Sequence, residues 1–251
     1  MKKHNIDSSS NPKIKELLKR VKKYYLFEGE KLVTDIINKR IKIDHLLVNK
    51  SNEVFINNIE DWRKISNLYV VNQRILKKFS NLKSVPDFIA LVNLKPEKIN
   101  FNKVDKLFVL FDIQDPANAG NIFRCASAFD IKNVIFTKES VKPNNPKFIR
   151  VAQNSLLDIK FNRFESFDEL LNVLNEKGFN IYLTSSHKTN RTIDITKVKK
   201  PFAIVIGNEG KGVDEKYFLQ YKSIRIYQTK NIESLNAGIS ACILMYELFK
   251  K

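Results

Sequence analysis

The chain contains few residues of the types that build metal sites and disulfide frameworks. Its 251 residues include two cysteines and three histidines. Cys125 and Cys242 lie far apart in the sequence and neither belongs to a CxxC pair, so we expect both thiols to be reduced and structural. His4, His45 and His187 are equally scattered. The sequence therefore predicts neither a disulfide framework nor a bound metal.

Long hydrophobic runs are also lacking. The longest apolar stretches, such as residues 107–111 and 202–206, have the length of strands, whereas a membrane-spanning helix needs roughly 20 residues. The first residues are charged and polar and lack the apolar core of a signal peptide. We therefore expect a cytoplasmic protein with no membrane span.

Acidic residues are few compared with basic ones. The chain has 27 Asp and Glu against 44 Lys and Arg, a net charge of +17. Residues 1–100 have 21 basic and 11 acidic residues, and residues 101–251 have 23 and 16, so the N-terminal part is the more basic. This excess favours a polyanionic partner, most simply nucleic acid. A lysine-rich genome is the alternative explanation.

Strand-like and helix-like segments alternate along the chain. Residues 11–25 have apolar residues at helical spacing and six Lys or Arg residues, which predicts a basic amphipathic helix. Further alternation up to residue 94 predicts a small α/β domain, and the polar residues 95–106 predict a linker. Residues 107–251 alternate again, which is typical of a mostly parallel sheet with helices on both faces.

In this C-terminal part the pattern predicts six strands and four long helices. The predicted strands are 107–112, 133–136, 157–161, 180–185, 202–206 and 223–227, and the predicted helices are 119–129, 146–153, 166–176 and 234–250.

Glycine is scarce, and five of the seven glycines lie in three stretches that join a predicted strand to a predicted helix: residues 111–129, 206–213 and 224–248. In open α/β sheets, ligands bind beyond the carboxyl ends of the strands. We therefore expect the three loops to form one site. The densest cluster indicates left-handed turns or a ligand lying against bare backbone, and it comprises Gly207, Gly210 and Gly212.

Common nucleotide and hydrolase motifs do not fit these loops. Val213 follows Gly212 where a phosphate-binding loop needs lysine. The glycine order differs from that of a dinucleotide-binding fingerprint, and the chain has no G-x-S-x-G elbow.

Three stretches resemble, in order, the motifs of the SpoU (TrmH-like) ribose 2'-O-methyltransferases of the SPOUT superfamily: DPANAGNIFR, IGNEGKGV and IESLNAGISACILMYE. The resemblance covers about residues 107–250. It implies S-adenosylmethionine as methyl donor, a trefoil knot in the C-terminal domain and a small N-terminal α/β (L30e-like) domain, residues 1–94, that binds RNA. It favours 23S ribosomal RNA as substrate. A tRNA substrate, or a non-catalytic RNA-binding protein that keeps the fold, is the alternative.

The resemblance also implies roles for individual residues. Since a guanidinium stays protonated at neutral pH, we expect Arg124 to orient the substrate and clamp a phosphate, with transient deprotonation at most. Glu209 would position Arg124 or be a solvated carboxylate. Asn118 would bind substrate or cap its helix, and Ser234 and Asn236 would act in the third motif or cap the last helix.

The residues implied in donor binding come from the second and third motifs: Ile206, Gly207, Asn208, Gly210, Gly212, Ile226, Tyr227, Leu235 and Asn236. Tyr227 stands where the family usually has proline, so the loop is less constrained there or the ring stacks on adenine. The last helix is apolar on most faces, which favours a homodimer through the C-terminal domain.

Overall fold

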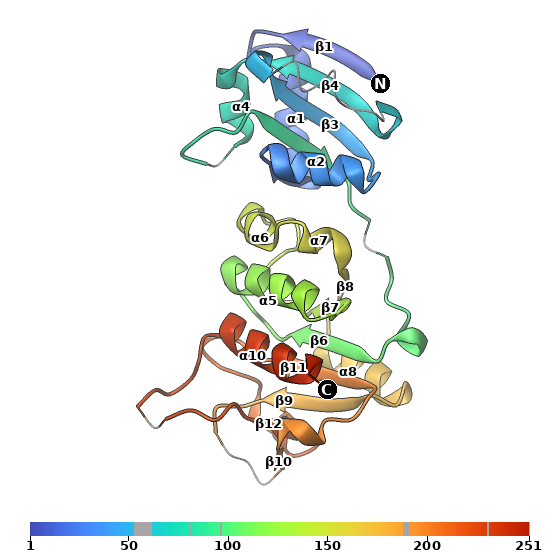
Figure 1. Cartoon of the computed structure of the whole chain (residues 1–251), viewed down its shortest axis with the longest axis vertical. Helices are drawn as coiled ribbons and strands as arrows, with labels where there is room; N and C mark the ends of the chain where they lie inside the picture. Colours follow the sequence, from blue (N-terminus) through green and yellow to red (C-terminus); the bar gives the residue numbers. More distant parts are fainter. Residues whose placement is uncertain (53–61, 81, 96, 188–190, 230, 251) are drawn as a thin grey trace. The chain divides into compact units, whose positions relative to one another are not determined.

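The computed structural model divides the chain into two compact units, Met1–Lys95 with Asn144–Arg150, and Pro96–Pro143 with Val151–Lys251. Figure 1 traces both units along the chain. The structure describes residues 1–52, 62–80, 82–95, 97–187, 191–229 and 231–250.

The first unit contains a mixed sheet of five strands in the order β1-β4-β3-β5-β2. β1, β4 and β3 are parallel, and β5 pairs antiparallel with β3 and β2. Its elements are β1 (Lys2–Ile6), α1 (Pro12–Arg20), η1 (Val21–Lys23), β2 (Tyr25–Glu28), α2 (Glu30–Asn38), β3 (Ile43–Asn49), η2 (Lys50–Asn52), η3 (Trp62–Lys64), β4 (Ile65–Val71), α4 (Gln73–Phe79) and β5 (Phe88–Val92).

Helix α1 shows why its residues fold in this way. The side chain of Asn11 accepts a hydrogen bond from Lys13 N at 2.9 Å, and Pro12 occupies the first turn, where its missing N–H costs nothing. Ile14 and Leu17 are buried in the core while the lysines face outward. Strand β1 was not expected from its polar sequence, which suits a sheet edge because charged side chains there discourage pairing with other chains.

The second unit contains a parallel sheet of seven strands in the order β10-β12-β9-β11-β6-β7-β8. Helix α6 (Pro146–Ala152) belongs to the first unit up to Arg150. The other elements from residue 97 are η4 (Phe101–Lys103), β6 (Lys106–Leu110), α5 (Pro116–Ala128), β7 (Asn133–Phe136), α7 (Ser155–Asp158), β8 (Lys160–Arg163), α8 (Phe167–Glu176), β9 (Asn180–Thr184), β10 (Thr192–Ile193), η5 (Ile195–Lys197), β11 (Phe202–Ile206), α9 (Glu215–Phe218), β12 (Lys222–Ile224) and α10 (Ala237–Phe249).

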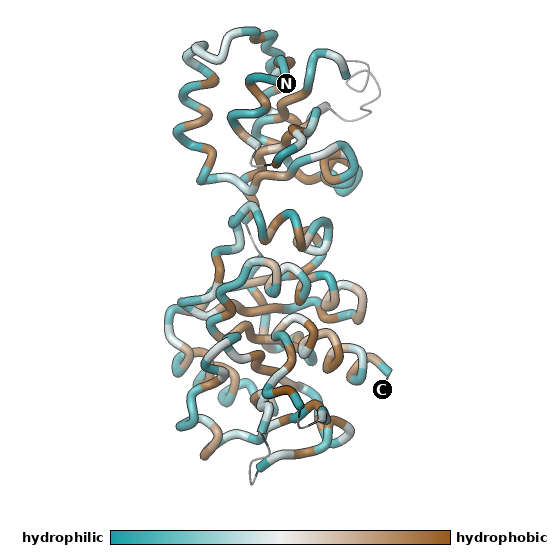
Figure 2. The backbone as a smooth tube through the Cα atoms, turned by 90° about the vertical axis from the view of Figure 1, so that its left-hand side faces the viewer, coloured by the Kyte–Doolittle hydropathy of each residue, from teal (hydrophilic) through white to brown (hydrophobic). Residues whose placement is uncertain are grey.

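Both faces of this sheet are buried, as the continuous apolar strands predict. Leu107 and Val109 pack in one core cluster with the inner face of α8. On the opposite face, Phe123 of α5 stacks on Phe136 of β7, with ring centroids 5.5 Å apart. Helices α5 and α10 lie side by side (Figure 1). Hydrophobic and hydrophilic stretches alternate along the tube in Figure 2. The predicted parallel sheet with covered faces is thus observed.

Several predicted boundaries differ from the structure. Helix α5 begins at Pro116, capped by Asp115, instead of near residue 119. The strand predicted at 157–161 is shifted, because α7 ends at Asp158 and β8 begins at Lys160. Helix α10 begins at Ala237 instead of Ser234, since Asn236 has the side-chain oxygen in capping position.

Part of the predicted linker 95–106 belongs to the second unit. Ile99 is buried in the core cluster around α8, and Phe101 packs against it. The apolar residues among the charged ones therefore anchor this segment. Among the described residues, no helix combines the length and apolar character that a bilayer span requires.

Candidate active site

The loop after β11, residues 207–213, folds back on itself. Asn208 N donates to Gly212 O at 3.1 Å, and Gly212 N donates to Asn208 O at 2.9 Å. A Cβ on Gly207 would lie 2.7 Å from the backbone carbon of Gly212, and Gly212 itself has a φ of 69°. These two positions need glycine for different reasons, close backbone approach and left-handed conformation. A Cβ on Gly210 would make only an ordinary contact, 3.7 Å from Asn208 Oδ1.

The loop after β6 is held against this glycine loop. Asp112 adopts a left-handed φ of 54°, which costs a non-glycine residue roughly 1–2 kcal/mol unless its surroundings fix it. Its amide donates to Thr137 Oγ1 at 2.8 Å, and its carbonyl accepts from Asn208 Nδ2 at 2.7 Å. Two neighbouring strand ends are thereby joined.

The carboxylate of Glu209 joins the glycine loop to the start of α5. It accepts hydrogen bonds from Gln114 N at 3.2 Å, Asp115 N at 3.1 Å and Asn118 Nδ2 at 2.9 Å. A carboxylate suits this place because backbone N–H groups at a helix start lack partners within the helix.

Asn118 extends the connection to the last helix. It is buried, and its Oδ1 accepts from Asn236 Nδ2 at 2.8 Å. Asn236 Oδ1 accepts in turn from Gly238 N at 2.9 Å and Ile239 N at 3.2 Å. Glu209, Asn118 and Asn236 therefore form one hydrogen-bonded chain through all three loops, which we call the loop junction.

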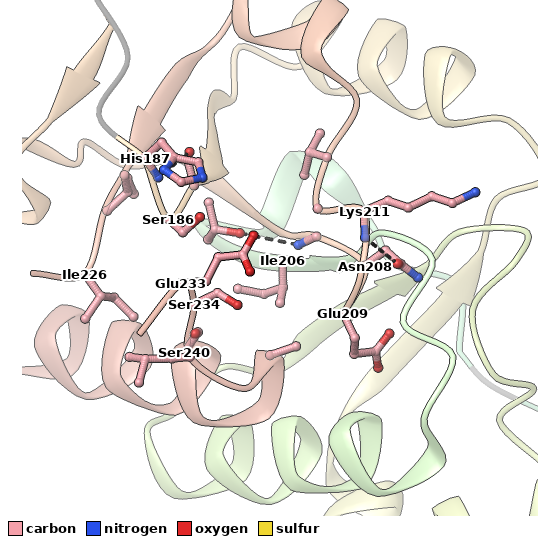
Figure 3. Close-up of a pocket in the computed structure, with 18 of the residues that line it drawn as sticks. Ser186, His187, Ile206, Asn208, Glu209, Lys211, Ile226, Glu233, Ser234 and Ser240 are labelled. Atoms are coloured by element: carbon pink, nitrogen blue, oxygen red, sulfur yellow. Dashed lines mark hydrogen bonds between the residues drawn. The ribbon is translucent and has the colours of Figure 1, made fainter. Parts of the chain in front are cut away.

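A cavity of about 540 Å³ opens beside the glycine loop (Figure 3). Ser186 and His187 flank it on one side and Asn208 and Lys211 on the other. The apolar part of its lining includes Ile206, Ile226, Leu235 and Leu244, and the polar part includes Thr184, Ser185, Ser186, His187, Asn208, Glu209, Glu233, Ser234 and Ser240. The mixture suits a ligand with a flat apolar moiety and several polar groups.

The structure separates the residues that the sequence grouped together. The cavity lining includes Ser234 and Glu209 and, among the expected donor-binding residues, Ile206, Gly207, Asn208, Gly210, Gly212, Ile226 and Leu235. Among the described residues, Tyr227 and Asn236 are outside that lining, and so are Arg124 and Asn118. The Tyr227 side chain is 81% exposed. Asn236 instead caps α10 and belongs to the loop junction.

Arg124 projects from α5 and is exposed. Among the described residues, its guanidinium has no hydrogen bond or ion pair. The Glu209 carboxylate, which the sequence analysis paired with Arg124, accepts its hydrogen bonds from the start of α5 instead. Asn118 and Ser234 were each considered as a helix cap. Asp115 caps α5 instead of Asn118, and Asn236 caps α10 instead of Ser234.

Thr184, Ser185, Ser186 and His187 line the cavity, although the sequence did not single them out. Thr184 is the last residue of β9, the strand next to β11, and the other three follow it directly. Their polar character at the carboxyl end of a parallel strand is the signal that could have located them, whereas glycines marked the other three loops.

Cys125 of α5 lies beside Cys242 of α10, and both thiols are free. Burial, followed by the hydrogen bond and charge of Cys242, raises the pKa of Cys125 to about 12. A thiol in this environment is a weak nucleophile. The described residues contain no group of three or more His, Cys, Asp or Glu side chains that could hold a metal ion.

Comparison with known sequences supports the similarity seen in the three loops. The profile of the SpoU rRNA methylase family matches residues 105–246. A Borreliella burgdorferi protein named as an uncharacterized tRNA/rRNA methyltransferase is 33% identical over 182 residues, 69% of this chain and 75% of that protein. The Bacillus subtilis 23S rRNA (guanosine(2553)-2'-O)-methyltransferase RlmP is 25% identical, with 97% and 98% of the two chains covered.

The fold is also similar to that of solved structures. A crystal structure of an AdoMet-bound rRNA methyltransferase from Sinorhizobium meliloti superimposes with a TM-score of 0.84, at 19% identity, over 99% of this chain and 98% of that one. The whole chain, with both units, therefore has counterparts of the same fold.

Proposed function

Because the chain belongs to the SpoU rRNA methylase family of RNA methyltransferases, we propose that it methylates a ribose 2'-hydroxyl, in 23S ribosomal RNA by preference. The observation that carries this proposal is the loop junction, which joins the three motif loops beside one cavity. Methyl transfer to an RNA hydroxyl requires donor and acceptor to be held in line, and loops fixed to one another would provide that.

S-adenosylmethionine is the cofactor of this family, and when bound it supplies a methyl group on a sulfonium. The cavity volume of about 540 Å³ lies within the roughly 300–1,000 Å³ usual for such ligands. Ile206, Ile226 and Leu235 would contact the flat adenine, and the glycines of the loop place no side chain between their backbone and the cavity. The hydroxyls after β9 and the carboxylate of Glu233 offer hydrogen-bond partners for polar and cationic groups.

Arg124 would orient the RNA. Its exposed guanidinium carries a fixed positive charge and a planar set of donors that matches a phosphate. By clamping a phosphate next to the target ribose, Arg124 would direct the 2'-oxygen toward the methyl group. As that oxygen formed its bond to the methyl carbon, the carbon–sulfur bond would break and the neutral thioether would leave, and a nearby RNA phosphate oxygen or water would accept the hydroxyl proton. Glu209 would position α5, and thus Arg124, from the glycine loop.

Ribosomal RNA is favoured because the Bacillus subtilis relative named as a 23S rRNA methyltransferase covers nearly the whole of both chains. The alternatives are a tRNA substrate and an RNA-binding protein without turnover. The excess of basic residues in residues 1–100 supports RNA binding by the first unit, and its mixed sheet flanked by helices is compatible with an L30e-like domain. The proposed methylation of ribosomal RNA would take place in the cytoplasm.

A trefoil knot is part of the proposal for the second unit. Strand β12 lies two strands away from β11, next to the sheet edge formed by β10, whereas α10 packs on α5. The chain from β12 to α10 must therefore return across the strand ends that carry the glycine loop. This path supports a knot that wraps the cavity.

A homodimer through α10 is also proposed. Ile239, Ile243 and Tyr246 are exposed at spacings of four and three residues, so they form one apolar stripe on the helix, and Phe249 is exposed near its end. Tyr246 packs edge-on against Phe129, which extends this stripe onto the end of α5. In Figure 2, hydrophobic residues (brown) recur along α10, the helix next to the C-terminus. Exposed apolar patches of this kind usually mark interfaces.

The enzymatic proposal is tested by transfer of tritiated methyl from S-adenosylmethionine to unmodified 23S ribosomal RNA and to tRNA. The product is hydrolysed to nucleosides. A labelled 2'-O-methyl nucleoside from 23S RNA is expected. Label only in tRNA would select the alternative substrate, label on a base would refute the ribose reaction, and no label with intact RNA binding would select the non-catalytic protein.

The dimer is tested by light scattering after size-exclusion chromatography. We expect twice the chain mass for the parental protein and the monomer mass for Ile243→Glu. A matched control, Glu176→Gln on the exposed end of α8, should remain dimeric. A parental protein of monomer mass would refute the dimer.

A further inference from the structure

The first unit has a hollow of its own, on the face of its sheet that α1 partly covers. Residues of β1, β4 and β3 form its floor. These three strands are neighbours in the sheet (Figure 1). His4 pairs in register with Tyr69, and His45 pairs with Asn67, so these four side chains share one face. The hollow has a volume of about 230 Å³ and we call it the His45 hollow.

Aromatic rings line the His45 hollow in a continuous row. The ring centroids of His4 and Tyr69 are 5.1 Å apart, those of Tyr69 and His45 are 5.8 Å apart, and those of His45 and Tyr24 are 5.3 Å apart. The two tyrosine hydroxyls lie 3.3 Å from the two nitrogens of His45, which fixes the orientation of the imidazole. Such a preorganised row offers π-faces and ring edges to a planar ligand.

Basic side chains surround the rings. Lys2, Lys13 and Arg20 line the hollow, and Glu16 is the one acidic residue among the described residues that line it. Arg20 contacts Glu16 at 3.2 Å, but both side chains are more than half exposed, so this ion pair is weak and easily exchanged for another anion. Lys13 Nζ lies 3.0 Å from His4 Nδ1.

The imidazoles are uncharged near neutral pH. Burial, with a contribution from the charge of Lys13, lowers the pKa of His4, and burial lowers the pKa of His45 despite the opposing effect of Asp44. The rim of the hollow is therefore cationic while its floor is aromatic and neutral. A planar ring would stack on the floor and an attached phosphate would reach the rim.

We propose that the His45 hollow binds one unstacked base of single-stranded RNA, with the flanking phosphates on Lys2, Lys13 and Arg20. The volume is below the roughly 300 Å³ of most small-molecule sites and suits a single base. Aromatic floors with cationic rims are the usual way in which proteins hold single-stranded nucleic acid. This inference deepens the proposed function and rests on it, since it locates a substrate contact remote in sequence from the methyl-transfer loops.

The test measures the anisotropy of a fluorescein-labelled single-stranded RNA of about 12 nucleotides, bound by the full chain. Loss of base stacking should weaken binding of Tyr24→Leu by about 5- to 150-fold. Tyr24→Phe keeps the ring and loses only the hydroxyl contact to His45, so its loss of affinity should be clearly smaller. Unchanged binding by Tyr24→Leu, or equal losses by both variants, would overturn the proposal.

Salt dependence separates this site from general attraction to a basic surface. Lys13→Gln should reduce the slope of log affinity against log salt by about 0.7, and Lys31→Gln on α2, outside the hollow, should leave it unchanged. Equal effects of the two variants would count against the hollow.

Two competitors define the ligand. A duplex of the same sequence should compete poorly, because its bases are stacked, and uridine monophosphate should need far higher concentrations than the single strand. Strong competition by the duplex, or by the free nucleotide, would contradict a site for single-stranded RNA. Methyl transfer is measured in parallel: transfer without a Tyr24 effect would refute this inference alone, and a Tyr24 effect without transfer would refute the proposed reaction alone.

Discussion

Glu209 accepts a hydrogen bond from Asn118 Nδ2 at 2.9 Å, which ties the glycine loop after β11 to helix α5. The oxygen of the same Asn118 amide accepts a hydrogen bond from Asn236 Nδ2, which connects both elements to helix α10. Because Asn118 is buried with its donor and acceptor both satisfied, a change at Glu209 or Asn236 leaves a buried polar atom of Asn118 without its partner.

We predict that Glu209→Gln lowers methyl transfer by about ten- to hundredfold, because an amide has only one oxygen to serve donors that now face both carboxylate oxygens. The measurement is single-turnover transfer to RNA. Glu176→Gln, an equivalent change on α8, should transfer at the parental rate. A parental rate for Glu209→Gln would show that the loop junction does not position the site.

Arg124→Ala should abolish methyl transfer, by about a hundredfold or more, while S-adenosylmethionine binding persists, because Arg124 lies outside the cavity lining. Arg124→Lys should recover little activity, since an ammonium lacks the planar pair of donors. The comparison uses transfer rates and calorimetric donor affinity. Arg74→Ala in α4 of the first unit is the control. Full activity of Arg124→Ala would refute the role of this residue.

Alanine at Gly212 should destabilise the second unit by about 1 kcal/mol and weaken donor binding, because the left-handed φ of 69° is unfavourable for alanine. Gly210→Ala is a matched control within the same loop, since its Cβ would meet nothing closer than 3.7 Å. Thermal unfolding and donor titration measure both effects. If the two variants behaved alike, the conformation of the glycine loop would not be what the donor site requires.

The stability of the first unit should fall as pH drops below about 6.5, the ordinary pKa of histidine. Burial lowers the pKa of His4 and His45 in the folded protein, so the unfolded chain binds protons first on acidification. The stabilisation is complete above pH 6.5 and is lost as pH falls through the lower, folded pKa values. Hydrogen exchange of the β3 and β4 amides, corrected for intrinsic rates, should show faster opening at pH 5.5 than at 7.5.

His45→Gln should reduce this pH dependence, since glutamine has no proton to bind in that range. Lys31→Gln should keep it. A pH dependence that is identical in His45→Gln and the parental protein would mean that another group is responsible.

The parallel sheet and its helices could be predicted from sequence because apolar runs such as residues 202–206 and polar turns alternate at regular intervals. The edge strand β1 could not, since Lys2 and Lys3 give it no apolar period. The start of α10 was misjudged because Ser234 and Asn236 are both good capping residues, and only the bond from Gly238 N identifies the cap.

As with the fold, part of the site could be predicted from the sequence and part could not. Glycine spacing and the family resemblance located the three loops. No local pattern shows that the Glu209 carboxylate accepts hydrogen bonds from the start of α5 and not from Arg124. The row of rings formed by His4, Tyr69 and His45 was equally hidden, because register between strands distant in sequence brings these residues together.

Calorimetric titration of S-adenosylmethionine into the parental protein tests most directly whether the cavity beside the loop junction is the donor site. We expect saturable heat that fits one site per chain and that prior saturation with S-adenosylhomocysteine removes. An absence of heat at concentrations that saturate ordinary methyltransferases, with no competition between the two compounds, would contradict the assignment of the cavity.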